Sequence, residues 1–323
     1  MKLSRAEFVR CSLGLGSVAL LDGGAESAAL AFSAGNMPKM KDLRSVSYLS
    51  GGGRVWCLSS RVDAISLSTV FVSPEGKVLV VDGGFYPDGE FLGEFLRAIG
   101  GKVDYWLITH AHEDHMGAIQ SMFAAKSGNP GINIGELLLD MPPQEWLDEK
   151  EPESKVHVDN FFSFLETGYG KTLPRGDCSP GRMVGLGSWS FEILNAPHRC
   201  DRNSINNSSI CLTVNAGGRK WLVTGDLGVE GGRSLACVLG SSRMRHDVVF
   251  MAHHGQSGTD KAFYEAVAPD VAIWPCPTWV WENAEKSGAL PGSHTLKTNY
   301  VKCWMQELGV KKNYVLTRDH VFV

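Results

Sequence analysis

The stretch Thr109-His110-Ala111-His112-Glu113-Asp114-His115 decides the fold and places the functional site of this chain. It follows the apolar run 103–108, whose length and β-branched and aromatic residues predict a buried strand. In α/β proteins the carboxyl ends of such strands carry the functional residues. The first two histidines are two positions apart, so on an extended chain both side chains point to the same side. Asp114 and His115 follow where the chain must turn, and they can face a second point close by.

The side chains of this stretch indicate a metal site. Neutral imidazole and carboxylate groups bind Zn, Mn or Fe, while the lack of cysteine here argues against a closed structural zinc site. One turn therefore offers ligands for two divalent metal ions, with zinc as the leading candidate and manganese or iron as alternatives. A hydroxide that bridges two such ions is a nucleophile at neutral pH. The residues therefore predict a metal site that activates water.

Later strands deliver more candidate ligands at their carboxyl ends. Each follows an apolar run of the same kind, and a glycine directly before the aspartate lets the backbone turn tightly there. The candidates are His198 after the strand 189–194, Asp226 after a hairpin with strands at 210–214 and 219–223, and His253 and His254 after the strand 246–251. Asp82 follows the apolar run 78–81 in the same way, and either supports the site from behind or caps a turn.

The pattern His-x-His-x-Asp-His behind a buried strand resembles the signature of the metallo-β-lactamase superfamily. This resemblance implies an α/β fold, a four-layer αββα sandwich of two mixed β-sheets flanked by helices. One domain over residues 37–323 would build it, with a one- or two-metal hydrolytic site at the edge between the sheets.

The same resemblance implies a ligand set. The first metal would be held by His110, His112 and His198, and the second by Asp114, His115 and His253, with Asp226 bridging the two ions. His254 stays open: it is either the ligand in place of His253, or a proton donor or phosphate-binding group. Asp114, Asp226 and His254 are thus the expected catalytic residues. His157 is interpreted as a surface or packing residue, and His294 stays open because the branch described next often has a histidine there.

Three strings in the second half narrow the resemblance. They resemble the metallo-β-lactamase domain of ComEC-type competence proteins, although Gln256 stands where serine is usual. The strings are Asn206-Asn207-Ser208-Ser209-Ile210, Leu222-Val223-Thr224-Gly225-Asp226-Leu227 and His253-His254-Gly255-Gln256-Ser257. The branch implies a hydrolase with phosphodiester chemistry as the leading suggestion and nuclease activity as a further option.

Charge and composition bear on the substrate. A formal net charge of −4 weakens the case for long duplex DNA, because neutralisation of phosphates dominates that binding. We therefore expect a small or short phosphodiester substrate and no stable nucleic-acid complex. The rival is hydrolysis of a lactone, lactam or thioester, which a neutral pocket lined by Trp279 and Trp281 would favour. Two further alternatives are a metal-binding accessory or sensor module, and a di-iron oxidoreductase, which usually has glutamate where this chain has His112.

The remaining features bound the class of protein. A chain of 323 residues that is 43% hydrophobic and 20% charged predicts a globular protein with a substantial core. Its eight cysteines form no C-x-x-C pair, and no run of 18 apolar residues predicts a transmembrane helix. Residues 1–36 combine early basic residues, a short apolar core and Ala29-Leu30-Ala31, which predicts an export signal and a periplasmic or extracellular location. The alternative is an N-terminal helix on a cytoplasmic protein.

Overall fold

The computed structural model describes residues 34–35, 52–124, 130–283 and 296–322. Apart from the two-residue strand β1 (Ala34–Gly35), the predicted export signal lies outside the described residues, and so does His294. None of the helices in the described ranges combines the length and apolar composition needed to cross a bilayer.

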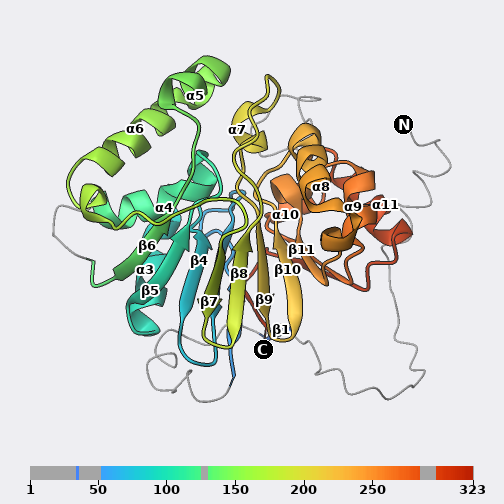
Figure 1. The fold of residues 1–323 in the computed structure, drawn as a ribbon, viewed down its shortest axis with the longest axis horizontal. Coiled ribbons are helices and arrows are strands. Elements are labelled where there is room, and N and C mark those ends of the chain that lie inside the picture. The colour runs from blue at the N-terminus through green and yellow to red at the C-terminus, as the bar shows by residue number, and fades with distance from the viewer. Residues whose placement is uncertain (1–33, 36–51, 125–129, 284–295, 323) are drawn as a thin grey trace.

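Two seven-stranded mixed sheets form the centre of the fold (Figure 1). In the first sheet the order is β1-β14-β2-β3-β4-β5-β6, with β4, β5 and β6 parallel and the other pairs antiparallel. Its strands are β2 (Arg54–Cys57), β3 (Ser68–Val72), β4 (Val78–Asp82), β5 (Lys102–Leu107), β6 (Asn133–Leu138) and β14 (His320–Phe322), besides β1.

The second sheet has the order β13-β12-β11-β10-β9-β8-β7. Here β10 to β13 are parallel, and β7 to β10 form antiparallel neighbours. The strands are β7 (Met183–Leu186), β8 (Trp189–Ile193), β9 (Leu212–Ala216), β10 (Arg219–Val223), β11 (Val248–Phe250), β12 (Val271–Trp274) and β13 (Lys312–Val315). The predicted hairpin is therefore confirmed as β9 and β10, paired from Ala216 and Arg219 onward.

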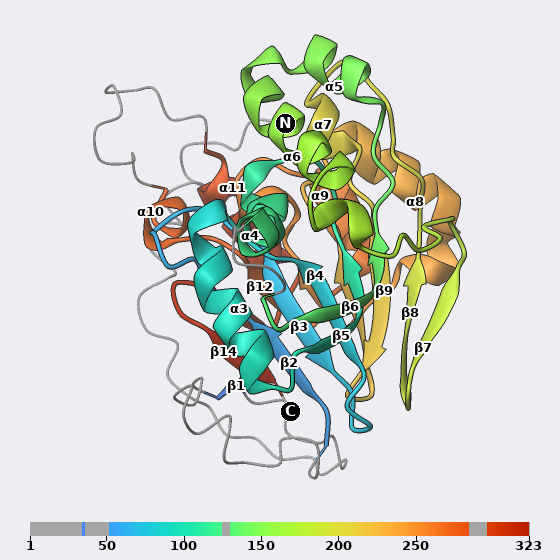
Figure 2. The ribbon, with the colours of Figure 1, turned by 90° about the vertical axis from the view of Figure 1, so that its left-hand side faces the viewer.

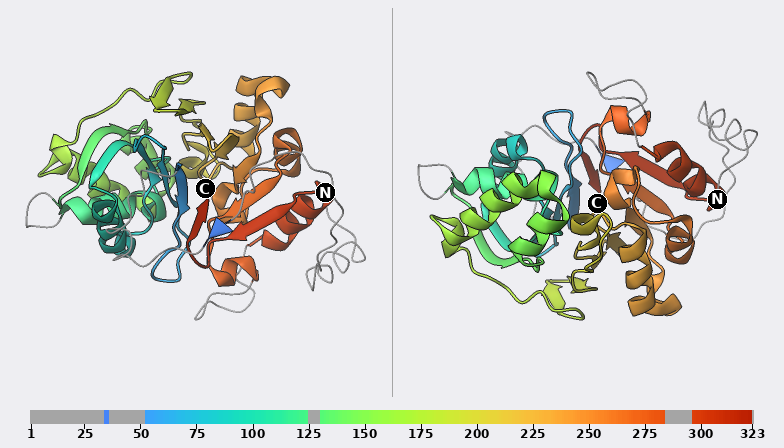
Figure 3. Two further views of the ribbon diagram at one scale, coloured as in Figure 1. Left: turned by 90° about the horizontal axis from the view of Figure 1, so that it is seen from below. Right: turned by 90° about the horizontal axis from the view of Figure 1, so that it is seen from above.

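Helices cover the outer face of each sheet, so the predicted four-layer sandwich is confirmed (Figures 1 and 3). The main helices over the first sheet are α3 (Gly89–Ala98), α4 (Glu113–Ala124) and α6 (Lys155–Glu166). Those over the second are α8 (Val229–Met244), α9 (Lys261–Val267) and α11 (Thr298–Glu307).

Three apolar cores correspond to the three interfaces between these layers. The strand β4 shows how the sequence builds two of them, because successive side chains of a strand point to opposite faces. Val78 and Val80 pack with the helices α3 and α4, while Leu79 and Val81 pack between the sheets. A strand buried on both faces must be apolar at every position, which is what the run 78–81 shows.

Short elements gather at the end of the sandwich where the parallel strands finish. An insert between β6 and β7 contains α5 (Gln144–Lys150), the 3-10 turn η2 (Pro152–Ser154), α6 and the turn η3 (Gly170–Thr172). The helix α7 (Ser204–Asn207) follows β8, and α5 and α7 lie at this same end (Figures 1 and 2). The turns η1 (Tyr86–Asp88) and η4 (Ala252–Gly255) and the helix α10 (Thr278–Trp281) complete the fold.

Candidate metal centre

The carboxyl ends of four parallel strands bring the candidate ligands together. His110 to His115 follow β5, Asp226 follows β10, His254 follows β11, and Asp82 ends β4. These strands belong to different sheets, and a hydrogen bond from Ile210 N–H to Thr109 O at 2.9 Å joins the two sheets beside the site.

Four of these side chains form a buried group that could hold one metal ion. Asp114, His115, Asp226 and His254 each offer one ligand atom, and these atoms lie within 4.8 Å of one another. His254 Nε2 is 2.9 Å from Asp114 Oδ2 and 3.2 Å from Asp226 Oδ2. His115 Nε2 is 3.3 Å from Asp226 Oδ1.

Three of the ligand atoms in this group are buried without a hydrogen-bond partner, as expected of atoms that bind a cation. Asp114 Oδ2, His115 Nε2 and His254 Nε2 are buried and, among the described residues, have no hydrogen-bond partner. The 2.9 Å approach of His254 to Asp114 therefore places the atoms close together without aligning them for a hydrogen bond. A buried polar atom without a partner costs about 1–3 kcal/mol, so three at one point call for a group that binds them all. Two imidazoles and two carboxylates are ligands that Zn, Mn and Fe accept.

His110 and His112 form a second pair of ligand atoms beside this group. His110 Nε2 lies 3.1 Å from His112 Nδ1 and 4.0 Å from Asp226 Oδ2. The carboxylate of Asp226 thus faces the imidazole pair as well as the four-ligand group. His253 Nε2 also approaches it, at 3.9 Å, with a side chain that is 19% exposed.

Each imidazole also has its second nitrogen held by an outer partner. Such contacts fix the tautomer and the orientation of a metal-binding histidine. The pairs are His115 Nδ1 with Asp82 Oδ2 at 2.7 Å, His254 Nδ1 with Pro275 O at 2.8 Å, His110 Nδ1 with Thr109 Oγ1 at 3.0 Å, His112 Nε2 with Glu151 Oε2 at 3.2 Å and His253 Nδ1 with Ser257 Oγ at 3.2 Å.

Backbone conformation at the strand ends is unusual. Asp82, His253 and His254 have φ angles of 56°, 50° and 57°, in the left-handed region that non-glycine residues rarely adopt. Such strain persists where surrounding contacts impose it, and it collects at functional sites. Gly225 has a φ of 52°, and a Cβ there would lie 2.7 Å from Ser209 Oγ, so the tight turn expected before Asp226 requires glycine.

Electrostatics couple the buried groups strongly. Burial opposes ionisation of Asp226, but the charges of His254 and His115 hold the pKa of its carboxyl well below the usual value. The pKa of Asp114 is also well below its usual value, because His115 and His254 outweigh burial. Burial lowers the pKa of His254, yet Asp226 and Asp114 raise it to about 9. The carboxylates therefore stay charged and available to a cation.

Some sequence expectations differ from this geometry or stay untested. The structure brings His254, rather than His253, into the four-ligand group. The reason is local: two successive left-handed residues turn the chain so that the residue farther from β11 faces inward. His198 is not in the group, and in the described ranges no hydrogen bond, ion pair or ring contact joins it to the other candidates. His198 as a ligand therefore stays a prediction. His157 has a half-exposed side chain and lies 2.6 Å from Glu113 Oε2.

The sequence did not point to the outer partners Glu151, Thr109 and Pro275. Glu151 is one of several acidic residues in the insert, and no spacing distinguishes it from its neighbours. A backbone carbonyl such as that of Pro275 leaves no mark in a sequence. Thr109 directly precedes His110, and a hydroxyl at the start of the motif was the one available signal.

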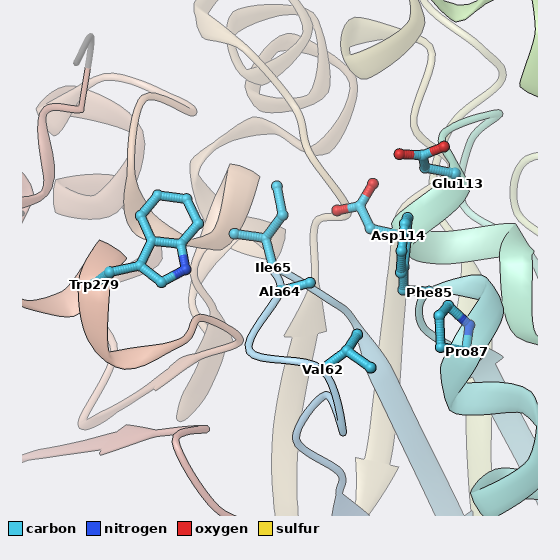
Figure 4. Close-up of a pocket in the computed structure, with 8 residues that line it drawn as sticks. All are labelled: Val62, Ala64, Ile65, Phe85, Pro87, Glu113, Asp114 and Trp279. Atoms are coloured by element: carbon cyan, nitrogen blue, oxygen red, sulfur yellow. The ribbon is translucent and has the colours of Figure 1, made fainter. Parts of the chain in front are cut away.

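A pocket of about 380 Å³ opens beside Asp114 (Figure 4). Trp279 lies at one end of it and Asp114 with Glu113 at the other, with apolar side chains between them. The indole Nε1 donates to Asp63 O at 3.1 Å, which fixes the ring against the loop 59–66. The lining residues in the described part of the chain are Val62, Ala64, Ile65, Phe85, Pro87, Glu113, Asp114 and Trp279, with no lysine or arginine among them. Trp281 packs instead against Trp274 and under Lys302.

An αββα sandwich with imidazoles and carboxylates gathered at its strand ends defines a class of metal-binding proteins. A family model described as the metallo-beta-lactamase superfamily matches residues 62–248, more than half of the chain. The chain therefore belongs to the metallo-β-lactamase superfamily.

One curated relative supports the narrower resemblance. ComE operon protein 3 of Bacillus subtilis (strain 168) is 28% identical over 243 residues, which is 67% of this chain. The match covers only 28% of that relative, so the chain resembles one part of a longer protein.

Solved structures of low sequence identity also match, without bearing on the substrate. The metallo-beta-lactamase fold protein YhfI from Bacillus subtilis has a TM-score of 0.49 and 11% identity, and covers 84% of this chain and 100% of its own. The diiron β-hydroxylase CmlA from Streptomyces venezuelae has a TM-score of 0.48 and 13% identity, and the match covers 84% of this chain and 54% of CmlA. Unliganded yeast PDE1 has a TM-score of 0.48 and 9% identity, and the match covers 84% of this chain and 99% of PDE1.

Proposed function

We propose that this protein is a metal-dependent hydrolase with two adjoining divalent-metal sites. The observation that carries the proposal is the position of the Asp226 carboxylate. Its Oδ1 lies 3.3 Å from His115 Nε2, and its Oδ2 lies 3.2 Å from His254 Nε2 and 4.0 Å from His110 Nε2. A carboxylate between two ligand groups is what a bridge between two ions requires. The first ion would be held by His110 and His112 with Asp226, and the second by Asp114, His115 and His254 with Asp226.

The residues of the chain have separable roles in this proposal. When bound, the ions would lower the pKa of a coordinated water from about 16 toward 7 and polarise the substrate oxygen. Asp226 would hold both sites in register, and Asp114, which also lines the pocket, would orient the attacking water. Asp82 would fix His115 through its 2.7 Å contact with Nδ1. His254 takes the ligand position, which leaves the partly exposed His253 to face the substrate.

For the substrate, a small phosphodiester is the leading candidate. Two divalent ions carry four positive charges, and Asp114, Asp226 and a hydroxide offset three of them. The remaining positive charge suits one anionic phosphodiester group. None of the described residues that line the pocket is basic, so the ions themselves would supply the attraction for phosphate. This agrees with a small substrate rather than a long nucleic acid, which would need basic residues along its backbone.

A second candidate is an uncharged acyl substrate such as a lactone or thioester. The observation in its favour is the apolar pocket wall, which has Trp279 at one end and no lysine or arginine among its described residues. Apolar lining with a few polar groups is typical of sites for small organic molecules. Both candidates use the same activated water, so they differ only in the bond that is cleaved.

The experiment compares wild type with Asp226→Ala and Asp114→Ala, using Asp201→Asn as the control. Asp201 has a side chain that is 87% exposed and pairs with Lys150 at 2.9 Å. Turnover of bis(p-nitrophenyl) phosphate and of a simple lactone is measured on zinc- and manganese-loaded protein. Loss of turnover in both alanine variants, with full turnover in the control, supports the proposal. Undiminished turnover in folded alanine variants would refute it, and the substrate that is cleaved decides between the two classes.

A further inference from the structure

His112 differs from the other core imidazoles in what holds its outer nitrogen. The partners of His115 and His110 are Asp82 and Thr109, and both lie directly at strand ends of the sandwich. His112 Nε2 instead faces Glu151 Oε2 at 3.2 Å. Glu151 directly follows α5 in the helical insert, 39 positions along the chain. The insert thus reaches the metal centre through one carboxylate.

Glu151 is itself held in place from two sides. Its side chain is only 14% exposed, and its Oε1 accepts a hydrogen bond from Ile205 N–H at 2.8 Å. Its backbone N–H donates to Leu147 O at 3.0 Å, which ties the residue to the end of α5. Each carboxylate oxygen therefore has its own donor, one on His112 and one on the first turn of α7. Figures 1 and 2 show α5 and α7 together at this end of the sandwich.

We propose that Glu151 is a positioning residue that selects Nδ1 of His112 as the metal-binding atom. A neutral imidazole carries one N–H, and the partner of one nitrogen decides which nitrogen keeps a free lone pair. With Nε2–H donated to Glu151, the lone pair remains on Nδ1. That atom lies 3.1 Å from His110 Nε2, the other proposed ligand of the first ion. This inference rests on the proposed metal site. It adds that the helical insert, through Glu151, is needed to complete the first of the two sites.

A carboxylate is required because both oxygens accept. In Glu151→Gln the amide NH₂ must face either His112 Nε2–H or Ile205 N–H, and two donors then oppose each other. In Glu151→Ala both donors lose their partner. Glu149→Gln is the matched control, because Glu149 lies in the last turn of α5, two residues before Glu151, with a side chain that is 72% exposed.

The test uses the full chain, uniformly labelled with ¹⁵N-histidine and loaded with zinc. Long-range ¹H–¹⁵N spectra report which nitrogen of His112 carries the proton, and competition with a chelator gives the affinity of each zinc ion. We expect wild type and Glu149→Gln to show His112 protonated at Nε2. Both Glu151 variants should lose this tautomer and bind one zinc ion about 10- to 100-fold more weakly, the usual effect of removing an outer partner. The other zinc ion should bind unchanged.

A purely structural role for Glu151 would weaken both ions alike and leave the His112 tautomer unaltered, and that result would overturn the proposal. Unchanged zinc affinities in the variants would overturn it as well. Glu151→Gln preserves the size of the side chain, so it provides the measurement if Glu151→Ala does not fold. Wild type that binds zinc with this dependence on Glu151 but hydrolyses neither substrate would refute the proposed function and leave the positioning role intact.

Discussion

Replacing Gly225 with alanine should damage the centre more than the same change at another left-handed glycine. Gly225 and Gly217 have φ angles of 52° and 58°, so an alanine at either is strained by about 1–2 kcal/mol. Their surroundings differ. A Cβ at Gly217 meets nothing within 4 Å, whereas at Gly225 it would lie 2.7 Å from Ser209 Oγ and 3.1 Å from Thr109 Cβ. Crowding of this kind typically adds about 1–3 kcal/mol.

The clash also falls on groups that orient the ligands. Ser209 Oγ accepts the backbone N–H of Asp226 at 3.0 Å and lies 3.3 Å from His110 Nδ1. Displacing Ser209 should therefore shift both the bridging carboxylate and an imidazole of the first site. We expect Gly225→Ala to lower the free energy of unfolding by about 2–5 kcal/mol in total, against about 1–2 kcal/mol for Gly217→Ala.

The assay is urea denaturation of both variants with a chelator and again with excess zinc. A ligand that binds only the folded state adds stability, so the gap between the variants should widen when zinc is present. Equal losses for the two alanines under both conditions would refute the reasoning, because backbone strain would then account for the whole effect.

Three further predictions concern other parts of the molecule. In Asp82→Asn the amide NH₂ must face either His115 Nδ1–H or the backbone N–H of Thr109, so two donors oppose each other. Zinc binding should weaken about 10- to 100-fold in a chelator competition, and wild-type affinity would contradict the role of Asp82. Burial lowers the pKa of His246 below 6.5, and its Nε2 lies 2.8 Å from Thr213 Oγ1. Because the unfolded chain then takes up the proton first, stability should fall from pH 7 toward 5, and less steeply in His246→Gln; parallel urea midpoints across this range would count against it. Trp279→Ala should raise KM about five- to tenfold at nearly constant kcat if the substrate covers roughly 50 Å² of the indole, at about 25 cal/mol per Å²; an unchanged KM would place the substrate elsewhere.

Sequence patterns predicted the framework because strand patterns and ligand motifs are local. The apolar runs before His110, Asp226 and His253 are visible as short segments, and each becomes the strand β5, β10 or β11. Their ends meet because parallel strands finish at one edge of the fold. The strands and the gathering of ligand types at that edge could therefore be predicted from the residues, while the arrangement of two mixed sheets between helices was implied by the resemblance to the metallo-β-lactamase superfamily.

What the sequence could not predict depends on backbone conformation and on distant contacts. His253 and His254 both have left-handed backbone conformations, and these decide which of the two side chains faces inward. No residue pattern predicts such conformations at non-glycine residues. The contact between Glu151 and His112 joins segments 39 positions apart, and it depends on how the insert folds back over the sandwich. His198 shows that a matching position in the sequence does not by itself place a side chain in the site. Its place after a strand matched the expected spacing, yet spacing alone does not direct a side chain.

The central claim is that Asp226 bridges two metal ions, and anomalous diffraction at the zinc edge from crystals grown with zinc tests it most directly. The account predicts two peaks, each about 2.0–2.2 Å from its ligand atoms. One should touch His110 Nε2 and His112 Nδ1, the other Asp114, His115 and His254, with a carboxylate oxygen of Asp226 on each. A single peak that leaves His110 and His112 without metal, or no peak at these residues, would contradict it.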